Sequence, residues 1–538
     1  MASDRTTSIP QSGTETELAD PMMLQWLSSL GFGVEYVRGA GNTLILRTGS
    51  GEEIPVIDFA GGYGSLILGH NHPEVVAAAR DFLDSGSPVL AQGSRQPAAS
   101  KVARLLNSIV QREFGESEPY FSVFSNSGAE SVEVALKHAE FDRVLELRAL
   151  EEEIGAHLDA ARAAVLDGGA KVTAPAFDAL DIGAEDREAG PAGFDRLAGA
   201  VRAENARRTA RPPVFLTLEG SFHGKLVGSV QLTHNAAYRL PFAAMAPPAR
   251  FIASDRPEAL GEVLARERRT VLDVVVEGGG IAVVERPFPV FGAFVCEVIQ
   301  GEGGIREMSP ETAREIQRAC ADAGCPIVVD EIQSGMGRTG AFFAASRIGL
   351  RADYYTLAKS LGGGIAKTAV TLIRGKRYRP EFELVHTSTF AKDTFSSTLA
   401  LRVLELLEAD GGRAYRLARE RGERLRAVFT ALREEFPGVV KEVRGTGLML
   451  GLEFHDQSGA TAHRIRAAAL AGVFGYAVSG YLLTAHRIRT FPTASAVNTL
   501  RFEPSLLLTD AEIDRLDQAL RALCRVLGDQ DGQAFAGD

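Results

Sequence analysis

Six short apolar runs between residues 120 and 373 constrain this chain more than any other feature of its sequence. They read YFSVFS, VFLTLEG, AFVCEVI, PIVVDE, DYYTLA and TAVTLI, and helical stretches separate them. Parallel strands need a crossover connection, so apolar runs that alternate with helices indicate a mostly parallel sheet covered on both faces. The sequence therefore predicts an α/β fold.

The segments on either side of this core show a different pattern of helices and strands. Residues 1–72 contain a short helix near Met22–Leu30 and three small strand-like runs between Val34 and Phe59. A long helical run begins at 396, and Gly- and Pro-bounded strands and a capped amphipathic helix follow it. We expect an N-terminal segment over 1–72, a large domain over 73–395 and a smaller α+β domain over 396–538.

Two inserts interrupt this plan. Residues 140–211 are rich in Ala, Arg and Glu and carry apolar stripes at helical spacing, which predicts a helical subdomain. Such stripes more often indicate packing than a cofactor site. Residues 271–289 predict a hairpin around the glycines at 278–280.

The bulk composition argues against several classes of function. The net charge is −11 and no basic patch is present, so we expect no nucleic-acid partner. The uncharged stretch 467–485 contains three glycines and fits a buried helix that runs into a strand better than a membrane span. The four cysteines lack zinc-ligand spacing, and the N-terminus lacks the apolar core of a signal peptide. We therefore expect a cytoplasmic protein without a metal site.

Lys359 stands where the run DYYTLA meets the glycine-rich turn SLGGG. A lysine at the end of a buried strand is costly unless its ammonium is paired or its amine is neutral. A neutral amine can attack an aldehyde to form a Schiff base, which is the chemistry of pyridoxal phosphate enzymes. The alternative is a lysine that ends a strand with its amine in water.

Other motifs supply the remaining parts of a site for a phosphorylated pyridine. In FSNSGAE a strand ends and a helix begins, so Ser127 and the following amides suit a phosphate, or simply cap the helix. Phe222, in GSFHGK, suits stacking on a ring or a place in the core. Asp330 ends an apolar run and needs a cation, either a protonated ring nitrogen or an arginine such as Arg338.

Two further motifs carry polar groups. The loop HTSTF at 386–390 offers hydroxyl donors for a phosphate, or is merely a turn. Arg501 ends the run TLRF just before Pro504, and its planar guanidinium suits the carboxylate of a substrate.

In this order, SNSGAESVEVALKHA, SFHG, EVIQGEGG, VVDEIQSGMGRTG, YYTLAKSLGGG, HTSTF and RFEP resemble the class III aminotransferases of PLP fold type I. The resemblance runs from about residue 58 to residue 527, apart from the inserts. It implies a pyridoxal 5'-phosphate cofactor, with pyridoxamine 5'-phosphate as its intermediate form. It also implies a ping-pong aminotransferase that works as a homodimer with its active site at the subunit interface.

The resemblance implies a role for each residue that matches these motifs. Lys359 would form the Schiff base and move the proton, and Asp330 would pair with the pyridinium nitrogen. The implied cofactor-binding residues are Ser127, Gly128 and Ala129 for the phosphate, Phe222 and His223 for the ring face, Gln333 for the ring oxygen, Asp330, Lys359, and Thr389 from the neighbouring subunit. The implied substrate-binding residues are Tyr63, Lys225, Glu302 and Arg501. Glu302 would cover Arg501 for a neutral substrate and swing away for glutamate.

The chain also departs from the family pattern. Lys225 stands where several relatives have an arginine, and Glu297-Val298 replaces the usual Glu-Pro pair. The insert 140–211 resembles those of natural-product aminotransferases, such as the caerulomycin-pathway enzyme that aminates an aldehyde. We therefore expect glutamate or glutamine as donor, a bulky aldehyde or ketone as acceptor, a role in secondary metabolite biosynthesis, and an insert that lines or covers the entrance.

Three alternatives stay open at this stage. One is a metabolic aminotransferase of the ornithine, acetylornithine or 4-aminobutyrate type. Another is an aminomutase, racemase or decarboxylase of the same fold. The third is a non-catalytic relative that acts by binding.

Overall fold

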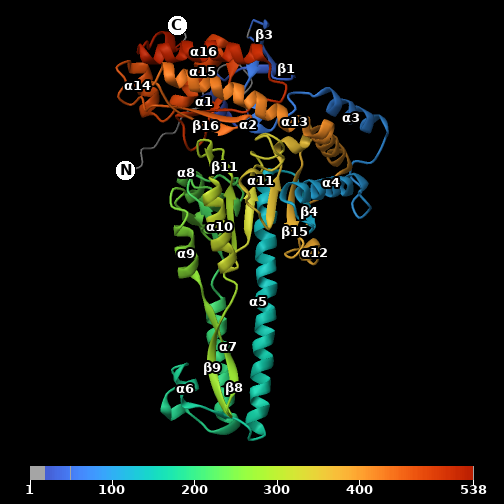
Figure 1. Cartoon of the computed structure of the whole chain (residues 1–538), viewed down its shortest axis with the longest axis vertical. Coiled ribbons are helices and arrows are strands. Elements are labelled where there is room, and N and C mark those ends of the chain that lie inside the picture. Colours follow the sequence, from blue (N-terminus) through green and yellow to red (C-terminus); the bar gives the residue numbers. More distant parts are fainter. Residues whose placement is uncertain (1–17, 49, 537–538) are drawn as a thin grey trace.

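The computed structural model describes residues 18–48 and 50–536. Its large lobe is built on a seven-stranded sheet of order β4-β15-β14-β13-β10-β6-β7 (Figure 1). The strands are β4 (Tyr120–Ser125), β15 (Ala369–Arg374), β14 (Tyr354–Leu357), β13 (Ile327–Asp330), β10 (Phe291–Glu297), β6 (Val214–Leu218) and β7 (Arg250–Ile252). Only β15 runs antiparallel to its neighbours. The predicted mostly parallel α/β sheet is confirmed, and β7 is the strand that the sequence did not indicate.

Helices cover both faces of this sheet. On one face α5 (Gly128–Leu166) packs Val132, Ala135 and Ala139 against Val295 and Val328. The larger apolar core, on the other face, includes buried residues of α4 (Pro97–Phe114), α10 (Pro310–Ala323) and α13 (Thr394–Glu435). The chain of α13 is non-helical from Ala409 to Gly412, so α13 consists of two helical parts.

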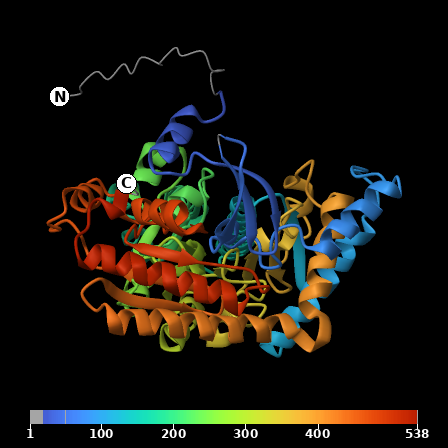
Figure 2. The same ribbon diagram turned by 90° about the horizontal axis from the view of Figure 1, so that it is seen from above.

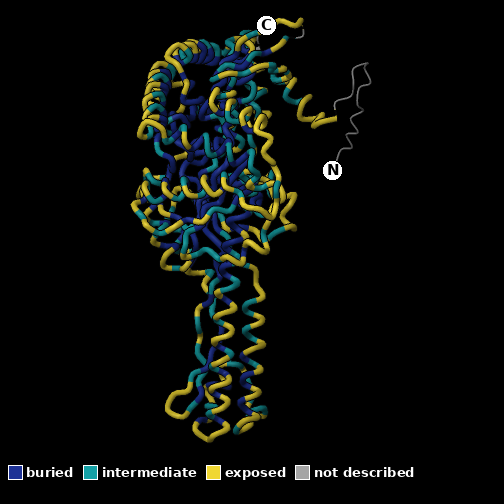
Figure 3. The backbone as a smooth tube through the Cα atoms, turned by 90° about the vertical axis from the view of Figure 1, so that its right-hand side faces the viewer, coloured by how far each residue is buried: buried dark blue, intermediate teal, exposed yellow. Residues whose placement is uncertain are grey.

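The two predicted inserts form one arm that projects from the large lobe on the side opposite the C-terminal lobe (Figures 1 and 3). It contains the far half of α5, α6 (Ala174–Asp178), α7 (Gly190–Thr209) and a sheet of β5 (Lys171–Val172), β9 (Gly280–Pro287) and β8 (Thr270–Glu277). The predicted stripes are its core, where Leu158 of α5, Leu197 of α7 and Val274 of β8 are all buried. The expectation that the insert lines or covers the entrance is wrong for this chain, because α5 carries the arm away from the sheet edge at which the helix begins.

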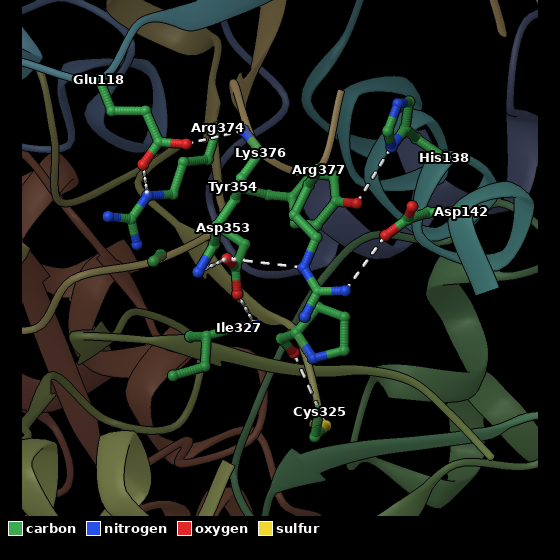
Figure 4. A network of polar contacts seen from close by, with 12 residues as sticks. Glu118, His138, Asp142, Cys325, Ile327, Asp353, Tyr354, Arg374, Lys376 and Arg377 are labelled. Carbon is green, nitrogen blue, oxygen red and sulfur yellow. Dashed lines mark hydrogen bonds and ion pairs between the residues drawn. The ribbon is translucent and has the colours of Figure 1, made fainter. Parts of the chain in front are cut away.

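A polar network clamps α5 where it leaves the sheet (Figure 4). The carboxylate of Asp142, almost fully buried, pairs with Arg377 at 3.2 Å and with Arg379. One turn earlier, the His138 ring contacts the Tyr354 hydroxyl at 3.0 Å and accepts from the Arg379 N–H at 3.2 Å. We call these five residues the clamp network, and it ties the middle of α5 to the start of β14 and the segment after β15.

The N- and C-terminal parts of the chain build a second lobe together (Figure 2). β1 (Glu35–Ala40), β2 (Thr43–Arg47) and β3 (Glu53–Asp58) form an antiparallel sheet that β18 (Ile488–Arg489) extends in parallel. Beside it lies the sheet of β16 (Val440–Thr446), β17 (Met449–Phe454), β20 (Thr499–Phe502) and β19 (Phe491–Pro492). The lobe also contains α1 (Pro21–Ser29), α14 (His463–Leu470), α15 (Phe474–His486) and α16 (Asp510–Gly528), whose capping box is formed by Thr509 and Glu512.

Shorter elements connect these units: α2 (Gly61–Gly64), α3 (Pro73–Asp84), α8 (Ala236–Arg239), α9 (Ala259–Glu267), β11 (Ile299–Gln300), β12 (Arg306–Glu307), α11 (Ala344–Ile348) and α12 (Phe382–Val385). Residues 467–485 fall in α14 and α15, so the predicted strand at their end is wrong. No helix in the described ranges is both long enough and apolar enough to cross a membrane. The four cysteines are buried and form no disulfide.

Candidate active site

The carboxyl edge of the central sheet gathers the chemically active residues. Glu297 ends β10 and Asp330 ends β13, and the parallel register places these two residues opposite each other. Ser127 follows β4 by two residues, and Lys359 follows β14 by two. Open α/β sheets bind ligands at this edge because the loops after parallel strands meet there.

A cavity of about 240 Å³ lies at this edge. Seven of the nine residues expected to bind the cofactor line it: Gly128, Ala129, Phe222, His223, Asp330, Gln333 and Lys359. The other two, Ser127 and Thr389, do not. Ser127 precedes Gly128, while Thr389 lies in the exposed loop after α12.

Asp330 is buried at the floor of the cavity and is tightly held. Its Oδ2 accepts from His223 Nδ1 at 2.9 Å, and its Oδ1 accepts from the Ile332 N–H at 3.1 Å and from the Thr356 hydroxyl at 3.4 Å. Burial alone would lower the pKa of His223, but the hydrogen bond to Asp330 and its charge raise this pKa overall. Arg338, the alternative partner considered for Asp330, instead donates to the carbonyls of Leu448 and Pro504.

Lys359 has a left-handed backbone, with φ of 46°. Such a conformation is costly for a residue with a side chain and is common where a structure holds a functional group in place. Burial lowers the pKa of the Lys359 amine, and the charges of Glu503 and Glu302 only partly oppose this effect. A lowered pKa makes the amine a better nucleophile near neutral pH.

The N-terminus of α5 forms one wall of the cavity. Ser127 is the N-cap residue and accepts from the Glu130 N–H at 3.3 Å, while Glu130 accepts from the N–H groups of Asn126 and Ser127. The N–H groups of Gly128 and Ala129 begin the helix and have no carbonyl partner within it. Two free amides at the positive end of a helix dipole suit an anion such as phosphate.

Glu297 is a buried residue whose role the sequence did not indicate. Its carboxylate accepts from the Phe222 N–H at 2.9 Å and from the Gly301 N–H at 3.1 Å. It thereby fixes the backbone that carries the Phe222 ring into the cavity. Burial raises the pKa of Glu297 to about 7. The signal was present in the sequence, since AFVCE ends an apolar run in an acid as IVVD does.

A second buried acid, Glu503, holds Gln333 in place: Gln333 Nε2 donates to Glu503 Oε1 at 2.7 Å. The Gln333 amide also packs against Gly301, where a Cβ atom would stand only 2.3 Å from Gln333 Oε1. A side chain at 301 would therefore displace the Gln333 amide from this position. Glu503 lies in the motif RFEP, in which the sequence pattern pointed only to Arg501.

Arg501 and Glu302 form a buried ion pair beside the cavity. Arg501 Nη1 donates to Glu302 Oε1 at 2.7 Å, Nη2 donates to Oε2, and Oε2 also accepts from the Ala494 N–H at 2.7 Å. The charge of Arg501 outweighs the effect of burial and lowers the pKa of Glu302. The arrangement is a carboxylate-binding arginine already occupied by a carboxylate of the chain.

The remaining two substrate residues lie at the rim. The Tyr63 ring is partly exposed and lies beneath the Arg501 guanidinium, 5.1 Å from its carbon. The Lys225 ammonium lies 4.0 Å from the centre of the Tyr238 ring, a cation–π contact. The backbone carbonyl of Thr389 accepts from Gln92 Nε2 at 3.1 Å.

The groups around the cavity fit pyridoxal phosphate. Asp330 offers a buried carboxylate that can hold a protonated ring nitrogen, and the free amides of Gly128 and Ala129 can hold a phosphate. The Lys359 amine, with its lowered pKa, suits the aldehyde. Among the described residues no cluster of three or more His, Cys, Asp or Glu side chains could hold a metal ion.

Comparison with known proteins agrees with this geometry. Solved structures with a similar fold include an ornithine aminotransferase from Toxoplasma gondii ME49, with 22% identity and a TM-score of 0.63 over 92% of this chain and 91% of that one. A transaminase from the marine bacterium Virgibacillus matches with 17% identity and a TM-score of 0.66 over 93% and 94%. A PLP-bound amine transaminase from an uncultivated Pseudomonas species matches with 19% identity and a TM-score of 0.64 over 92% and 95%. The family model "Aminotransferase class-III" matches residues 29–524, and the chain therefore belongs to the class III aminotransferases, which are PLP-dependent enzymes.

Proposed function

We propose that this enzyme moves an amino group from a glutamate- or glutamine-like donor to an aldehyde or ketone acceptor by a ping-pong mechanism, in secondary metabolite biosynthesis. The observation that carries the reaction type is the meeting of Lys359, Asp330 and the N-terminus of α5 in one cavity. Bound pyridoxal phosphate supplies the electron sink that makes the bond from the donor Cα to hydrogen labile.

The side chains of the cavity would hold the cofactor and move the proton of the donor. With the cofactor bound, Asp330 would hold a proton at its ring nitrogen, and His223 keeps Asp330 oriented through its Nδ1. The amides of Gly128 and Ala129, beside Ser127, would bind its phosphate. Phe222 would pack on the ring, and Gln333 would donate to the ring oxygen. The Lys359 amine takes the proton from the donor Cα, because it lies in the same cavity and its pKa is lowered.

The pair of Arg501 and Glu302 supports two different substrates in turn. A donor carboxylate displaces Glu302 and binds the guanidinium, whereas an uncharged acceptor leaves the pair closed. Both states keep Arg501 paired, so neither substrate leaves the buried guanidinium without a counter-charge. This exchange is what a ping-pong enzyme needs when its donor and acceptor differ in charge.

We also propose a homodimer. A cavity of about 590 Å³ on the α5 side of the sheet is lined mainly by apolar residues, including Phe141, Phe215 and Val385. Exposed apolar side chains extend this surface: Leu240, Phe242, Met245, Leu384, Val385 and Phe390. A patch of this kind marks an association surface. It includes the loop that bears Thr389, in keeping with a contribution of Thr389 to the partner's site.

The aromatic rim favours a bulky acceptor over a small one. Tyr63 packs near Phe491 at 5.4 Å, and the Tyr476 ring lies 4.9 Å from the Trp26 ring. The Lys225 ammonium already makes a cation–π contact with Tyr238, so this lysine is a weaker partner for a distal carboxylate of the substrate.

The rival candidate function is that of an ornithine-type aminotransferase, because one neighbour in fold is an ornithine aminotransferase.

For the location of the protein, the four unpaired, buried thiols favour the cytoplasm.

A screen of donors and acceptors, followed by the colour of the bound cofactor, tests the proposal. Glutamate or glutamine should bleach the yellow form, and an aldehyde acceptor should restore it. Lys359→Ala should lose both colour and turnover, whereas Lys367→Ala, an exposed lysine after the same turn, should keep both. Turnover of a single amino acid without any carbonyl acceptor would favour an aminomutase, racemase or decarboxylase instead. Rapid use of ornithine would favour the rival.

A further inference from the structure

Glu297 is a buried acid that lines the cavity, and none of the steps proposed above uses its carboxylate. It ends β10 and stands opposite Asp330, the last residue of β13, in the parallel register. Two carboxylates side by side in a buried site are costly, because like charges repel there and water does not solvate them. The arrangement is therefore stable only if the chain itself supplies donors to Glu297.

The donors are the backbone amides of two separate loops. Glu297 Oε2 accepts from the Phe222 N–H, in the loop after β6, at 2.9 Å, and Oε1 accepts from the Gly301 N–H, just after β11, at 3.1 Å. Neither amide has another acceptor within the described ranges. A carboxylate accepts with both of its oxygens, whereas a glutamine would offer one oxygen and one NH₂ group. Glu297 thus bridges the two loops in a way that only an acid can.

Each of these loops carries or supports a group of the cofactor site. Phe222 itself lines the cavity. Gly301 supports the Gln333 amide, since a Cβ atom at 301 would stand only 2.3 Å from Gln333 Oε1. The Gly301 loop then continues into Glu302, whose carboxylate pairs with Arg501. The separation of the Phe222 ring from the Gln333 amide therefore depends on the Glu297 bridge.

We propose that Glu297 is a positioning residue of the cofactor site: its carboxylate holds the Phe222 loop and the Gly301 loop at a fixed separation, so that the Phe222 ring and the Gln333 amide are in place before the cofactor binds. This inference rests on the proposed roles of Phe222 and Gln333. A site whose contacts are already in place binds its ligand more tightly than one that must order its loops on binding.

Hydrogen exchange in the full-length protein freed of cofactor tests the bridge itself. Mass spectrometry with fragmentation follows single amides at about pH 8, where Glu297 is mostly ionised because burial raises its pKa only to about 7. In the wild type the amides of Phe222 and Gly301 should both be protected. Glu297→Gln keeps the size of the side chain but turns its NH₂ group toward one of these amides, which should exchange about tenfold faster or more.

Glu113→Gln is the matched control, because the Glu113 carboxylate also bridges two amides. It accepts from the Phe342 N–H at 3.0 Å and from the Phe343 N–H at 3.1 Å, and it does not line the cofactor cavity. This variant should speed exchange at 342 or 343 and leave the amides of Phe222 and Gly301 at their wild-type rates.

Binding of pyridoxamine 5'-phosphate measures the consequence for the site, because this form of the cofactor makes no covalent bond to Lys359. Equilibrium dialysis should give an affinity about fivefold weaker or more in Glu297→Gln, as its loops must be ordered on binding, and a wild-type affinity in Glu113→Gln. If Glu297→Gln does not fold, Glu297→Asp replaces it. Its carboxylate is one methylene group too short to reach both amides, so the same two changes are expected.

Three results would overturn the proposal. They are unprotected Phe222 and Gly301 amides in the wild type, unchanged exchange of both amides in the folded variant, and an unchanged affinity for pyridoxamine 5'-phosphate despite faster exchange. Neither measurement needs turnover, so a wrong donor or acceptor in the proposed reaction would change neither outcome.

Discussion

Glu302→Gln offers a sharp test of the proposed exchange at Arg501. In the structure a carboxylate donor must displace Glu302, which makes two charge-assisted hydrogen bonds to a guanidinium that is 2% exposed. The glutamine keeps the size of the side chain, and its amide oxygen can still accept one hydrogen bond from the guanidinium. It removes the negative charge that competes with the donor.

The magnitude follows from the two bonds. A hydrogen bond that involves a charged group contributes about 1.5–3 kcal/mol, so at the lower end Glu302 contributes about 3 kcal/mol with two bonds and the glutamine about 1.5 kcal/mol with one. The donor carboxylate should therefore bind about 1.5 kcal/mol more favourably, which is roughly tenfold in affinity. An uncharged acceptor gains nothing, and it now faces a buried guanidinium without its counter-charge, so its use should fall about tenfold or more.

Single half-reactions followed by the cofactor's absorbance measure both effects separately. Glutamate mixed with the yellow enzyme gives the apparent affinity for the donor, and the aldehyde mixed with the aminated enzyme gives the use of the acceptor. Glu307→Gln is the control, because Glu307 is exposed on the same segment, and its carboxylate accepts from the Gly445 N–H instead of contacting Arg501. Unchanged or weaker glutamate affinity in Glu302→Gln would refute the exchange.

Three further predictions follow from the contacts. Asp330 raises the pKa of His223, so the interaction between them stabilises the folded protein. This stabilisation is complete below the ordinary histidine pKa and is lost as the pH rises through the raised pKa of His223. Urea unfolding of the cofactor-free Asp330→Asn variant should lack this pH dependence. Asp142→Ala should lower the free energy of unfolding by about 3 kcal/mol, because it removes the buried carboxylate from Arg377 and Arg379 and leaves them only longer ion pairs with Glu146 and Asp353. Denaturant titration measures this loss, and a loss below about 1 kcal/mol would contradict the role of the clamp. The arm can be removed by replacing 151–204 with a short linker and 273–284 with a two-residue turn. The cut ends lie close enough to join, because Leu150 and Asn205 line one pocket and Leu272 pairs with Glu285. The shortened enzyme should keep its turnover. A folded but inactive product would contradict this, and removing the hairpin alone should cause aggregation by uncovering the helices.

The central sheet was predictable because its signal is local. Each of the six apolar runs forms a strand, and parallel strands place their carboxyl ends at one edge. That rule also explains why motifs as distant in sequence as Gly128 and Lys359 line one cavity. Glu297 and Glu503 were missed although each follows an apolar run, because an acid at a strand end has many structural uses.

The pairing of distant segments was not predictable from sequence patterns. Neither β18 nor β5 is longer than two residues, so neither has a periodicity to detect. Yet β18 joins the N-terminal sheet to the C-terminal part, and β5 joins the two inserts into one arm. The position of the arm was missed for a related reason. Its direction is set by α5, which continues through the predicted start of the insert at 140 without a break.

The single helix α5 links the phosphate-binding end of the site to the arm, and this raises a mechanical question. At about 1.5 Å per residue its 39 residues span about 58 Å, so a rigid rod of this length would transmit every tilt of the arm to the amides of Gly128 and Ala129. The clamp network holds the helix at His138 and Asp142, and the residues before it pack on the sheet. Bending of the arm should therefore turn about the clamp, while the first turns of α5 stay fixed. This is the physical reason to expect that the enzyme works without its arm but not with a broken clamp.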